Sequence, residues 1–234
     1  MKLLLAALAL AAASTPVSLF DGHSLNGWWW SPDAAAPAPS WAAGAGILRT
    51  TPGQGTEVYL LTRDSFSDFD LSFEFNFEPG ANSGVKYRFQ GYWVGPPGTG
   101  KVEAEPGPPT RIEPIALEYQ IADDVAHPDA AGDSRHATAA IYEYWPAAKS
   151  GPCRPNMWHT GRIVARGMHI EHWLDGVKVV DVELDSAELQ AAFRASERRR
   201  SSPLLAKQAR RTSPIALQFH DKVVQFRNLS IRRL

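Results

Sequence analysis

Cysteine is almost absent from this sequence of 234 residues, since Cys153 is the only one. A single cysteine cannot form an internal disulfide, so small disulfide-stabilised folds are excluded and a hydrophobic core has to supply the stability. A chain of this length can bury such a core within one domain. Cys153 lies in the turn-like stretch GPCRPN, which lacks the histidine pattern of a thiol nucleophile, and we interpret it as structural.

An excess of charge of one sign is also missing. The 24 Lys and Arg residues nearly balance the 25 Asp and Glu residues. Such a chain has no overall field that attracts a polyanion, so nucleic acid is not expected as a partner and a neutral ligand fits better. The run Arg198–Arg200 has no interleaved aromatic residues, and we interpret it as a solvated surface.

Long hydrophobic runs are limited to one, from Leu3 to Leu10. It is too short to cross a bilayer, which takes about 20 residues. Lys2 precedes it and small residues follow at 11–13, the pattern of a secretory signal. We therefore expect a signal peptide at residues 1–13, a single domain over 14–234, and a periplasmic or secreted protein. No membrane contact beyond the signal peptide is expected.

Several well-marked catalytic motifs are missing as well. The sequence contains no HExxH, no paired CxxC, no GxGxxG before a helix and no GxSxG. Zinc-peptidase, dinucleotide-binding and α/β-hydrolase functions therefore lose their main support. The histidines are scattered along the chain, so a divalent metal stays open as a cofactor without being indicated.

Aromatic and turn-forming residues, by contrast, are frequent. Eight Trp, ten Phe, 18 Gly and 18 Pro favour a β protein over a helical one. In DFDLSFEFNF the apolar residues from Phe69 to Phe77 alternate with polar ones, which predicts a half-buried strand. VKYRFQGYW and IALEYQIA show the same alternation. Residues 136–145 and 160–184 supply three further strands, the last two joined at Asp175-Gly176, and 213–234 reads as a closing hairpin that turns near Asp221-Lys222.

These strands predict an all-β fold, an antiparallel two-sheet sandwich of the jelly-roll type. Two segments depart from the strand pattern. Residues 186–210 predict one short surface helix with Ser186 as its N-cap. Residues 95–114 are rich in Gly and Pro and predict a long loop, which in compact domains is often functional.

Polar residues also occur in pairs on four of the predicted strands. The pairs are Lys86 with Arg88, Glu118 with Gln120, Glu171 or His172 with Trp173, and Gln218 with His220. If these strands are neighbours, their polar faces form a surface of hydrogen-bonding groups flanked by aromatic rings, which suits a sugar. An ordinary solvated sheet face explains the same pattern equally well. The two alternatives differ at Glu118, because a covered carboxylate needs a partner whereas an exposed one does not.

Six segments in order carry a family resemblance: SLFDGHSLNGW, DFDLSFEFNFEPGANSGVKYR, LEYQIADD, HATAAIY, MWHTGRIVARGMHIEHWLDGVKVVD and ALQFHDKVVQFRNLSIR. Together they resemble the 3-keto-disaccharide hydrolase family over about residues 17–233. The resemblance implies a concanavalin A-like jelly roll in a secreted or periplasmic bacterial protein. It also implies activity on glycosides whose glucose ring is already oxidised at carbon 3.

The resemblance also indicates site residues by position. As catalytic residues it implies Glu118, His220, Arg88 and His172. As substrate-binding residues it implies Asn82, Gln120, Asp123, His136, Tyr142 and Gln218, and the polar pairs on the strands add Lys86 and Trp173. The carbohydrate partner would be an oxidised glucoside or disaccharide.

The expected chemistry is an elimination. A ketone at carbon 3 acidifies the carbon 2 proton, so a base, Glu118 or His220, can remove it and the glycosidic oxygen then leaves from carbon 1. Arg88, Lys86 or a divalent metal would stabilise the enolate. Two alternatives stay open: a lectin-like module without catalysis, and a glycosidase with two carboxylates that pairs Glu118 with Asp123 or Glu171.

Overall fold

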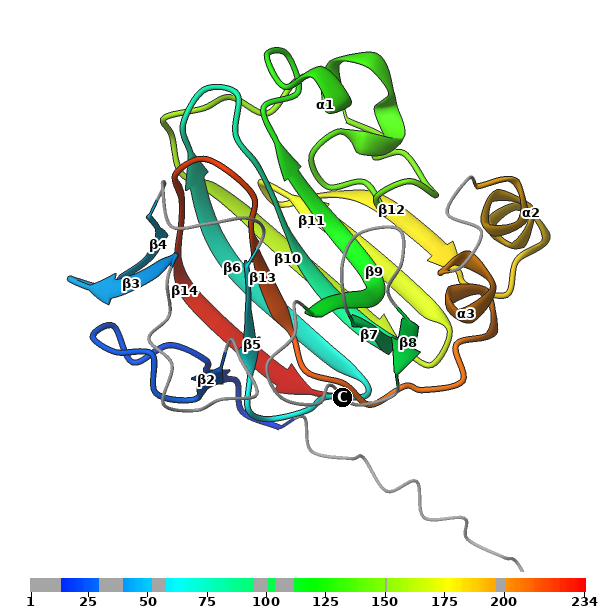
Figure 1. Ribbon diagram of the computed structural model, residues 1–234, viewed down its shortest axis with the longest axis horizontal. Helices are drawn as coiled ribbons and strands as arrows, with labels where there is room; N and C mark the ends of the chain where they lie inside the picture. The colour runs from blue at the N-terminus through cyan, green and yellow to red at the C-terminus, as the bar shows by residue number, and fades with distance from the viewer. Residues whose placement is uncertain are drawn as a thin grey trace, which may run out of the picture.

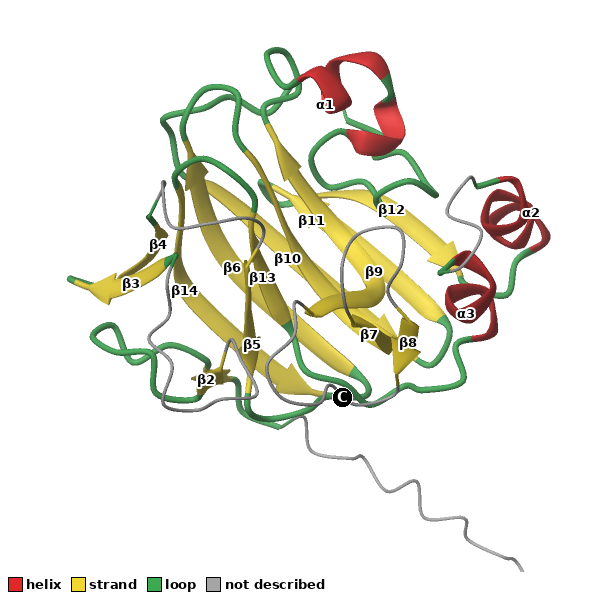
Figure 2. Ribbon diagram, in the orientation of Figure 1, coloured by secondary structure: helices red, strands yellow, loops and turns green. Residues whose placement is uncertain are grey.

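The computed structural model describes residues 14–29, 40–51, 58–94, 101–103, 112–149, 151–196 and 201–234. The expected signal peptide at residues 1–13 and the basic run at 198–200 lie outside the described residues. The described residues form two antiparallel sheets that face each other, with short helices at two places on the periphery (Figures 1 and 2).

The larger sheet has eight strands among the described residues. Its order is β12 (Val177–Glu183), β11 (His169–Leu174), β10 (His159–Arg166), β6 (Phe69–Phe77), β14 (Val224–Arg233), β4 (Ile47–Thr50) and β3 (Trp41–Gly44), and β1 (Val17–Ser18) pairs with β14. In the turn between β11 and β12, Asp175 and Gly176 both have left-handed backbone angles, with φ of 49° and 80°. The sequence predicts this hairpin correctly, because Asp-Gly tolerates positive φ.

The smaller sheet has six strands among the described residues, and it carries the site discussed below. Its order is β2 (Trp28–Trp29), β5 (Val58–Thr62), β13 (Ala216–Phe219) and β7 (Asn82–Val94), and both β8 (Lys101–Glu103) and β9 (Ile112–Ala122) pair with β7. Strands β13, β7 and β9 are thus neighbours, as the polar pairs on them require. The fourth polar pair lies on β11 in the other sheet.

The core lies between the two sheets. From Phe69 to Phe77 every second residue of β6 is buried, which confirms the predicted alternation. The inner face of the smaller sheet contributes Val85, Tyr87, Leu117, Tyr119 and Ile121 to the same cluster. A second, smaller cluster on the outer face of that sheet combines Tyr59, Leu61, Phe89, Tyr92 and Ala216.

The helical content differs from the sequence prediction. The segment 186–210 holds two helices, α2 (Ala187–Ala195) and α3 (Ser202–Lys207), instead of one. The Ser186 side chain accepts a hydrogen bond from the Leu189 amide and caps α2 as predicted. A further helix, α1 (Pro128–Gly132), and a 3₁₀ turn, η1 (Ser134–His136), follow β9. No described helix has the length and apolar character that a membrane crossing requires.

Three strand predictions need correction. Residues 136–145 do not form a strand but a series of turns with isolated bridges at Ile141. Residues 159–183 hold three strands, because Gly167, with φ of 58°, turns the chain between β10 and β11. Strands β13 and β14 belong to different sheets, so the turn near Asp221 connects the sheets and closes no hairpin. The predicted loop at 95–114 contains β8 and the first residues of β9.

Candidate functional site

A polar cavity of about 280 Å³ lies on the outer face of the smaller sheet. Its lining comes from β7, β9, β13 and the segments that follow β9 and β13: Asn82, Lys86, Glu113, Glu118, Gln120, His127, Asp129, Tyr142, Gln218 and His220. The polar side chains of the sheet are covered, since Lys86, Glu118 and Gln120 are only 5%, 6% and 1% exposed. The ordinary solvated sheet face is therefore the wrong interpretation of the pattern.

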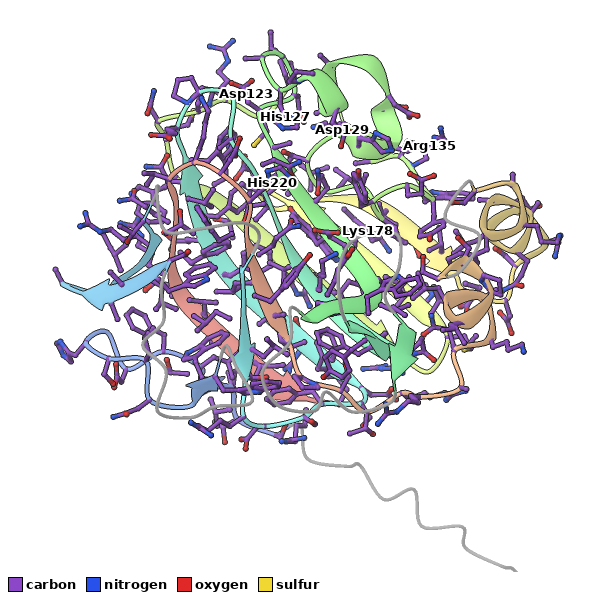
Figure 3. The ribbon with its side chains drawn as sticks, viewed as in Figure 1. Asp123, His127, Asp129, Arg135, Lys178 and His220 are labelled. Carbon is purple, nitrogen blue, oxygen red and sulfur yellow. The ribbon has the colours of Figure 1, made fainter. Side chains whose placement is uncertain are left out.

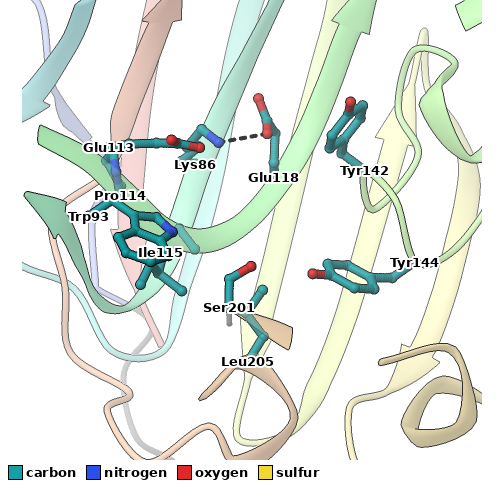
Figure 4. Close-up of a pocket in the computed structure, with 11 residues that line it drawn as sticks. Lys86, Trp93, Glu113, Pro114, Ile115, Glu118, Tyr142, Tyr144, Ser201 and Leu205 are labelled. Atoms are coloured by element: carbon teal, nitrogen blue, oxygen red, sulfur yellow. Dashed lines mark hydrogen bonds and ion pairs between the residues drawn. The ribbon is translucent and has the colours of Figure 1, made fainter. Parts of the chain in front are cut away.

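Glu118 and Lys86 lie directly opposite each other on β9 and β7. The Lys86 ammonium donates to Glu118 Oε2 over 2.8 Å, and the ion pair is buried (Figure 4). Glu118 Oε1 is also buried and has no hydrogen-bond partner among the described residues. An unpaired buried polar atom costs about 1–3 kcal/mol, and a bound molecule that donates a hydrogen bond to this oxygen would remove that cost.

Gly84 makes the position of this carboxylate possible. A β-carbon added at Gly84 would lie 2.1 Å from Glu118 Oε1 and 2.8 Å from its Cγ and Cδ atoms. Any side chain at this position would occupy the space that the carboxylate fills. The glycine of the GANSGVKYR segment is thus required by a close approach across two strands.

Amide side chains surround the carboxylate. Gln120 donates to Asn82 Oδ1 over 3.1 Å, and Gln218 donates to Tyr59 Oη over 3.3 Å. The Ser83 hydroxyl donates to the Gln218 carbonyl over 2.7 Å and ties β7 to β13. Amides present both donors and acceptors, which matches the hydroxyl groups of a sugar.

A narrow extension of about 40 Å³ continues the cavity towards α3. It shares Lys86, Glu113, Glu118 and Tyr142 with the polar cavity and adds a mostly apolar lining from Trp93, Pro114, Ile115, Ala116, Tyr144, Ser201 and Leu205 (Figure 4). The site therefore has a polar end and a more apolar end, with the ion pair between them.

Tyr142 is positioned by a constrained loop. Its backbone amide donates to the Glu118 carbonyl over 3.0 Å, which attaches the loop to β9. Ala139 and Glu143 on either side have left-handed backbone angles, with φ of 69° and 74°. Such angles are unfavourable for residues other than glycine, so surrounding contacts have to hold them. In Figure 4 the Tyr142 ring lies beside Glu118, on the side away from Lys86.

His172 lies outside the cavity, in contrast to the catalytic role that the resemblance implies. It is fully buried between the sheets, where the Tyr87 hydroxyl lies 2.7 Å from Nε2 and the Ala139 carbonyl 2.9 Å from Nδ1. Burial lowers the pKa of His172 to about 4, against the opposing effect of the Ala139 hydrogen bond. The ring is therefore neutral, with Nδ1–H donating to Ala139 and Nε2 accepting from Tyr87. It supports the loop that carries Tyr142.

Arg88 also lies outside the polar cavity. A bulge between Tyr87 and Gly91 interrupts the pairing of β7 with β9, and Arg88 has φ of 57°. The bulge removes Arg88 from the face that Lys86 occupies, because a shift in register changes the face of each following side chain. Its guanidinium donates to Asp68 Oδ1 over 3.1 Å and to the Gly167 carbonyl over 2.9 Å. Arg88 thus joins the two sheets at their edge.

Asp123 and Trp173 do not line the cavity either. Asp123 accepts hydrogen bonds from the Gly80, Val125 and Ala126 amides, and it shapes the turn after β9. Burial works to raise the pKa of Asp123, but these hydrogen bonds outweigh it and the pKa is lowered. Trp173 lies on β11 of the larger sheet, where Arg162 and Lys178 contact its ring. Alternation puts it on the outer face of that sheet, because His172 faces inwards.

A metal site requires several His, Cys, Asp or Glu ligand atoms close to one another. Among the described residues, one group of three has ligand atoms close enough to share an ion: His169, Glu171 and Asp181. They lie on β11 and β12 in the larger sheet, and the Lys178 ammonium is 3.2 Å from Glu171 Oε1 and 2.5 Å from Asp181 Oδ2. That cation already neutralises the carboxylates. The cavity residues described above do not form such a group.

Three cavity residues were missed by the sequence analysis: Glu113, His127 and Asp129. Glu113 has the wrong parity to share a face with Glu118, and it reaches the cavity because β9 curls at its N-terminal end (Figure 4). His127 and Asp129 lie in and beside α1, where no periodicity predicts a direction. The His127 and His220 rings meet edge to face, with centroids 6.3 Å apart, at the end of the cavity below α1 (Figure 3).

The comparisons with known proteins agree with the fold and the family resemblance. A curated 3-keto-disaccharide hydrolase of Bacteroides thetaiotaomicron is 24% identical over 93% of this chain and 78% of its own length. A crystallised candidate glycosyl hydrolase of Parabacteroides distasonis superposes with a TM-score of 0.75, at 19% identity and 94% coverage of both chains. A Bacillus subtilis protein with a galectin-like fold reaches a TM-score of 0.50 at 10% identity, with 95% and 96% coverage.

These structural neighbours and the two antiparallel sheets identify the fold as the concanavalin A-like jelly roll. The family model described as the 3-keto-alpha-glucoside-1,2-lyase-like domain matches residues 15–232, which is nearly the whole chain. The protein therefore belongs to the 3-keto-alpha-glucoside-1,2-lyase-like family.

Proposed function

We propose that this protein cleaves 3-keto-glucosides and 3-keto-disaccharides by elimination followed by addition of water. The observation that carries the proposal is the Glu118 carboxylate, with Oε2 bound to Lys86 and a buried Oε1 that has no partner among the described residues. A base held in this way suits the removal of a proton from carbon. The 1,2-lyase description of the family supports the same chemistry.

In the proposed reaction Glu118 Oε1 takes the proton from carbon 2 of the sugar. The adjacent ketone makes this proton acidic, and negative charge develops on the ketone oxygen. The Lys86 ammonium, which lies 2.8 Å from Glu118 Oε2, would stabilise that charge. A fixed cation in a cavity shielded from water stabilises an enolate more than the same cation does in solution.

Collapse of the enolate expels the oxygen on carbon 1 and leaves a double bond between carbons 1 and 2. Water then adds at carbon 1 and Glu118 returns its proton to carbon 2, so the net reaction is hydrolysis. The amides of Asn82, Gln120 and Gln218 would bind the sugar hydroxyls at the polar end of the cavity. His220 lines the same end and would contact the sugar there.

The decisive experiment compares a 3-keto-glucoside with its unoxidised parent as substrates. Only the ketone supplies an acidic carbon 2 proton, so the protein should cleave the first and leave the second essentially untouched. Glu118→Gln should lose at least about 100-fold in turnover, the usual contribution of a general base. Glu171→Gln serves as the matched control, because that carboxylate lies on the other sheet and should be dispensable.

Two outcomes would contradict the proposal. A lectin-like module would bind one or both sugars and cleave neither. A glycosidase with two carboxylates would cleave the parent at a comparable rate, with Glu113 or Asp129 as the second acid that lines the cavity. The acids named from the sequence for that role, Asp123 and Glu171, lie outside the cavity.

A further inference from the structure

Four side chains beside the cavity form a continuous chain of hydrogen bonds and ion pairs. The Tyr142 hydroxyl donates to Asp129 Oδ2 over 2.9 Å. Asp129 Oδ1 lies 2.8 Å from His136 Nδ1, and His136 Nε2 lies 3.2 Å from Glu143 Oε2. The chain begins at the cavity, which Tyr142 and Asp129 line, and ends away from it at Glu143.

The protonation of His136 follows from counting its hydrogen bonds. Each ring nitrogen faces a carboxylate oxygen, and a carboxylate can only accept. A neutral imidazole has one N–H and satisfies one of them, whereas an imidazolium donates to both. The arrangement therefore matches a charged ring that holds one mobile proton between two carboxylates.

The backbone holds this chain in register. The Glu143 side chain reaches His136 from a residue with left-handed φ, and its Oε1 accepts a further hydrogen bond from Ser196 Oγ over 3.0 Å. The His136 and Tyr142 rings pack against each other with centroids 4.6 Å apart. Strained backbone that is fixed by several contacts is characteristic of functional positions.

We propose that Tyr142 donates a proton to the leaving oxygen and later accepts one from water, and that Asp129, His136 and Glu143 store this proton between the two steps. The proposal rests on the proposed function and names the acid that it leaves open. Tyr142 would be a catalytic residue, because its hydroxyl reaches the cavity. The other three act through it as positioning residues.

In the elimination the Tyr142 proton moves to the leaving oxygen. The His136 Nδ1 proton moves to the Asp129 carboxylate, and the carboxyl group formed in this way rotates and passes that proton to the Tyr142 oxygen. His136 is then neutral and still donates from Nε2 to Glu143. In the hydration each transfer runs backwards, so that water loses a proton to Tyr142 and His136 is charged again. Glu118 handles the carbon 2 proton separately in both steps.

The experiment compares leaving groups of different acidity. Methyl 3-keto-glucoside releases a poor leaving group that needs a proton, whereas p-nitrophenyl 3-keto-glucoside releases a stable anion. Tyr142→Phe should lower kcat/KM for the methyl glycoside by at least about 100-fold, the usual contribution of a general acid, and should lower nitrophenol release by only a few-fold. His136→Gln and Glu143→Gln should show the same selectivity to a smaller degree.

A second readout follows the intermediate. In the hydration step Tyr142 accepts a proton from water, so Tyr142→Phe should consume the unsaturated ketone, supplied directly as the substrate, more slowly than the wild type does, as the loss of its ultraviolet absorption would show. Asp133→Asn is the matched control. It removes a negative charge near His136 and keeps the cap acceptor of η1, and it should leave both activities unchanged.

The outcomes separate the two proposals. If the wild-type protein cleaves neither 3-keto substrate, the proposed function fails and this inference fails with it. If the wild type cleaves both substrates and Tyr142→Phe lowers kcat/KM equally for both, the four hydrogen-bonded side chains only support the fold or bind substrate. This inference alone is then overturned. Tyr142→Phe removes a single oxygen, so it remains informative even if His136→Gln does not fold.

Discussion

Gly84→Ala tests the carboxylate position without substituting any polar residue. The added β-carbon would lie 2.1 Å from Glu118 Oε1, whereas ordinary contact begins at 3.4 Å. The oxygen therefore has to move by 1.3 Å, the difference between these two distances, and the 2.8 Å contact of Oε2 with Lys86 is disturbed as well. A displacement of about 1 Å at a reacting group can cost roughly 100-fold in rate.

The expected result is thus a loss of about 100-fold in kcat/KM on a 3-keto-glucoside with a modest change in stability. The clash costs about 1–3 kcal/mol if it is not relieved, but the Glu118 side chain can rotate away, and alanine is favoured over glycine in a strand by about 0.5–1 kcal/mol. Activity would be measured by initial rates, and stability by urea denaturation followed by circular dichroism.

Gly161→Ala is the matched control for this variant. Its β-carbon would lie 2.4 Å from Cε2 and Cζ of the Phe73 ring in the core, far from the cavity. A packed ring cannot move aside, so we expect a loss of about 1–3 kcal/mol in stability and unchanged activity of the folded protein. If Gly84→Ala keeps wild-type turnover, the carboxylate position described above is not the one that acts.

Three further predictions concern residues outside the cavity. Arg88→Met should lower the free energy of unfolding in urea by about 1–3 kcal/mol, because it removes a buried guanidinium that is paired with the partly exposed Asp68, and it should keep its turnover; lost turnover at full stability would restore Arg88 to the site. Since the pKa of His172 is about 4 in the folded protein and about 6.5 unfolded, its stabilising contribution is complete above pH 6.5. That contribution should fall by about 3 kcal/mol as the pH is lowered to 4, and an equally steep decline in His172→Asn would refute it. Burial raises the pKa of the Cys153 thiol to about 12, so iodoacetamide at pH 8 should modify it only after unfolding, as mass spectrometry would reveal.

The sequence predicts those parts of the fold that follow a strict period. The alternation from Phe69 to Phe77 and around Glu118 is regular, and both strands lie where the pattern places them. The polar face of β7, β9 and β13 could be predicted for the same reason. The sequence does not predict that this polar face is covered, because the residues that cover it come from irregular segments after β9 and β13.

Among the predicted site residues that lie outside the cavity, Arg88 and His172 do so for reasons that differ. Arg88 follows a bulge, and no local pattern in VKYRFQGYW reveals that the register changes there. His172 could have been assigned correctly, because it shares its parity with Ile170 and Leu174, which are both buried core residues. The family resemblance implies a catalytic role for His172, whereas this parity indicates a core position.

The contribution of Gly84 and the chain behind Tyr142 required the three-dimensional structure. Gly84 matters through a side chain on the neighbouring strand, so the pairing of β7 with β9 has to be known first. Asp129 and Glu143 approach His136 from a helix and from a left-handed turn. Neither arrangement leaves a periodic signal in the sequence.

The central claim is that Glu118 removes the proton from carbon 2, and a 3-keto-glucoside with deuterium at that carbon tests it most directly. The wild-type protein should release the aglycone more slowly from the deuterated substrate, or pass deuterium to the solvent early in the time course, beyond the exchange seen without protein. Glu118→Gln should do neither while remaining folded. Release at equal rates with all deuterium retained at carbon 2 would contradict the account, because the carbon–deuterium bond would then never have been broken.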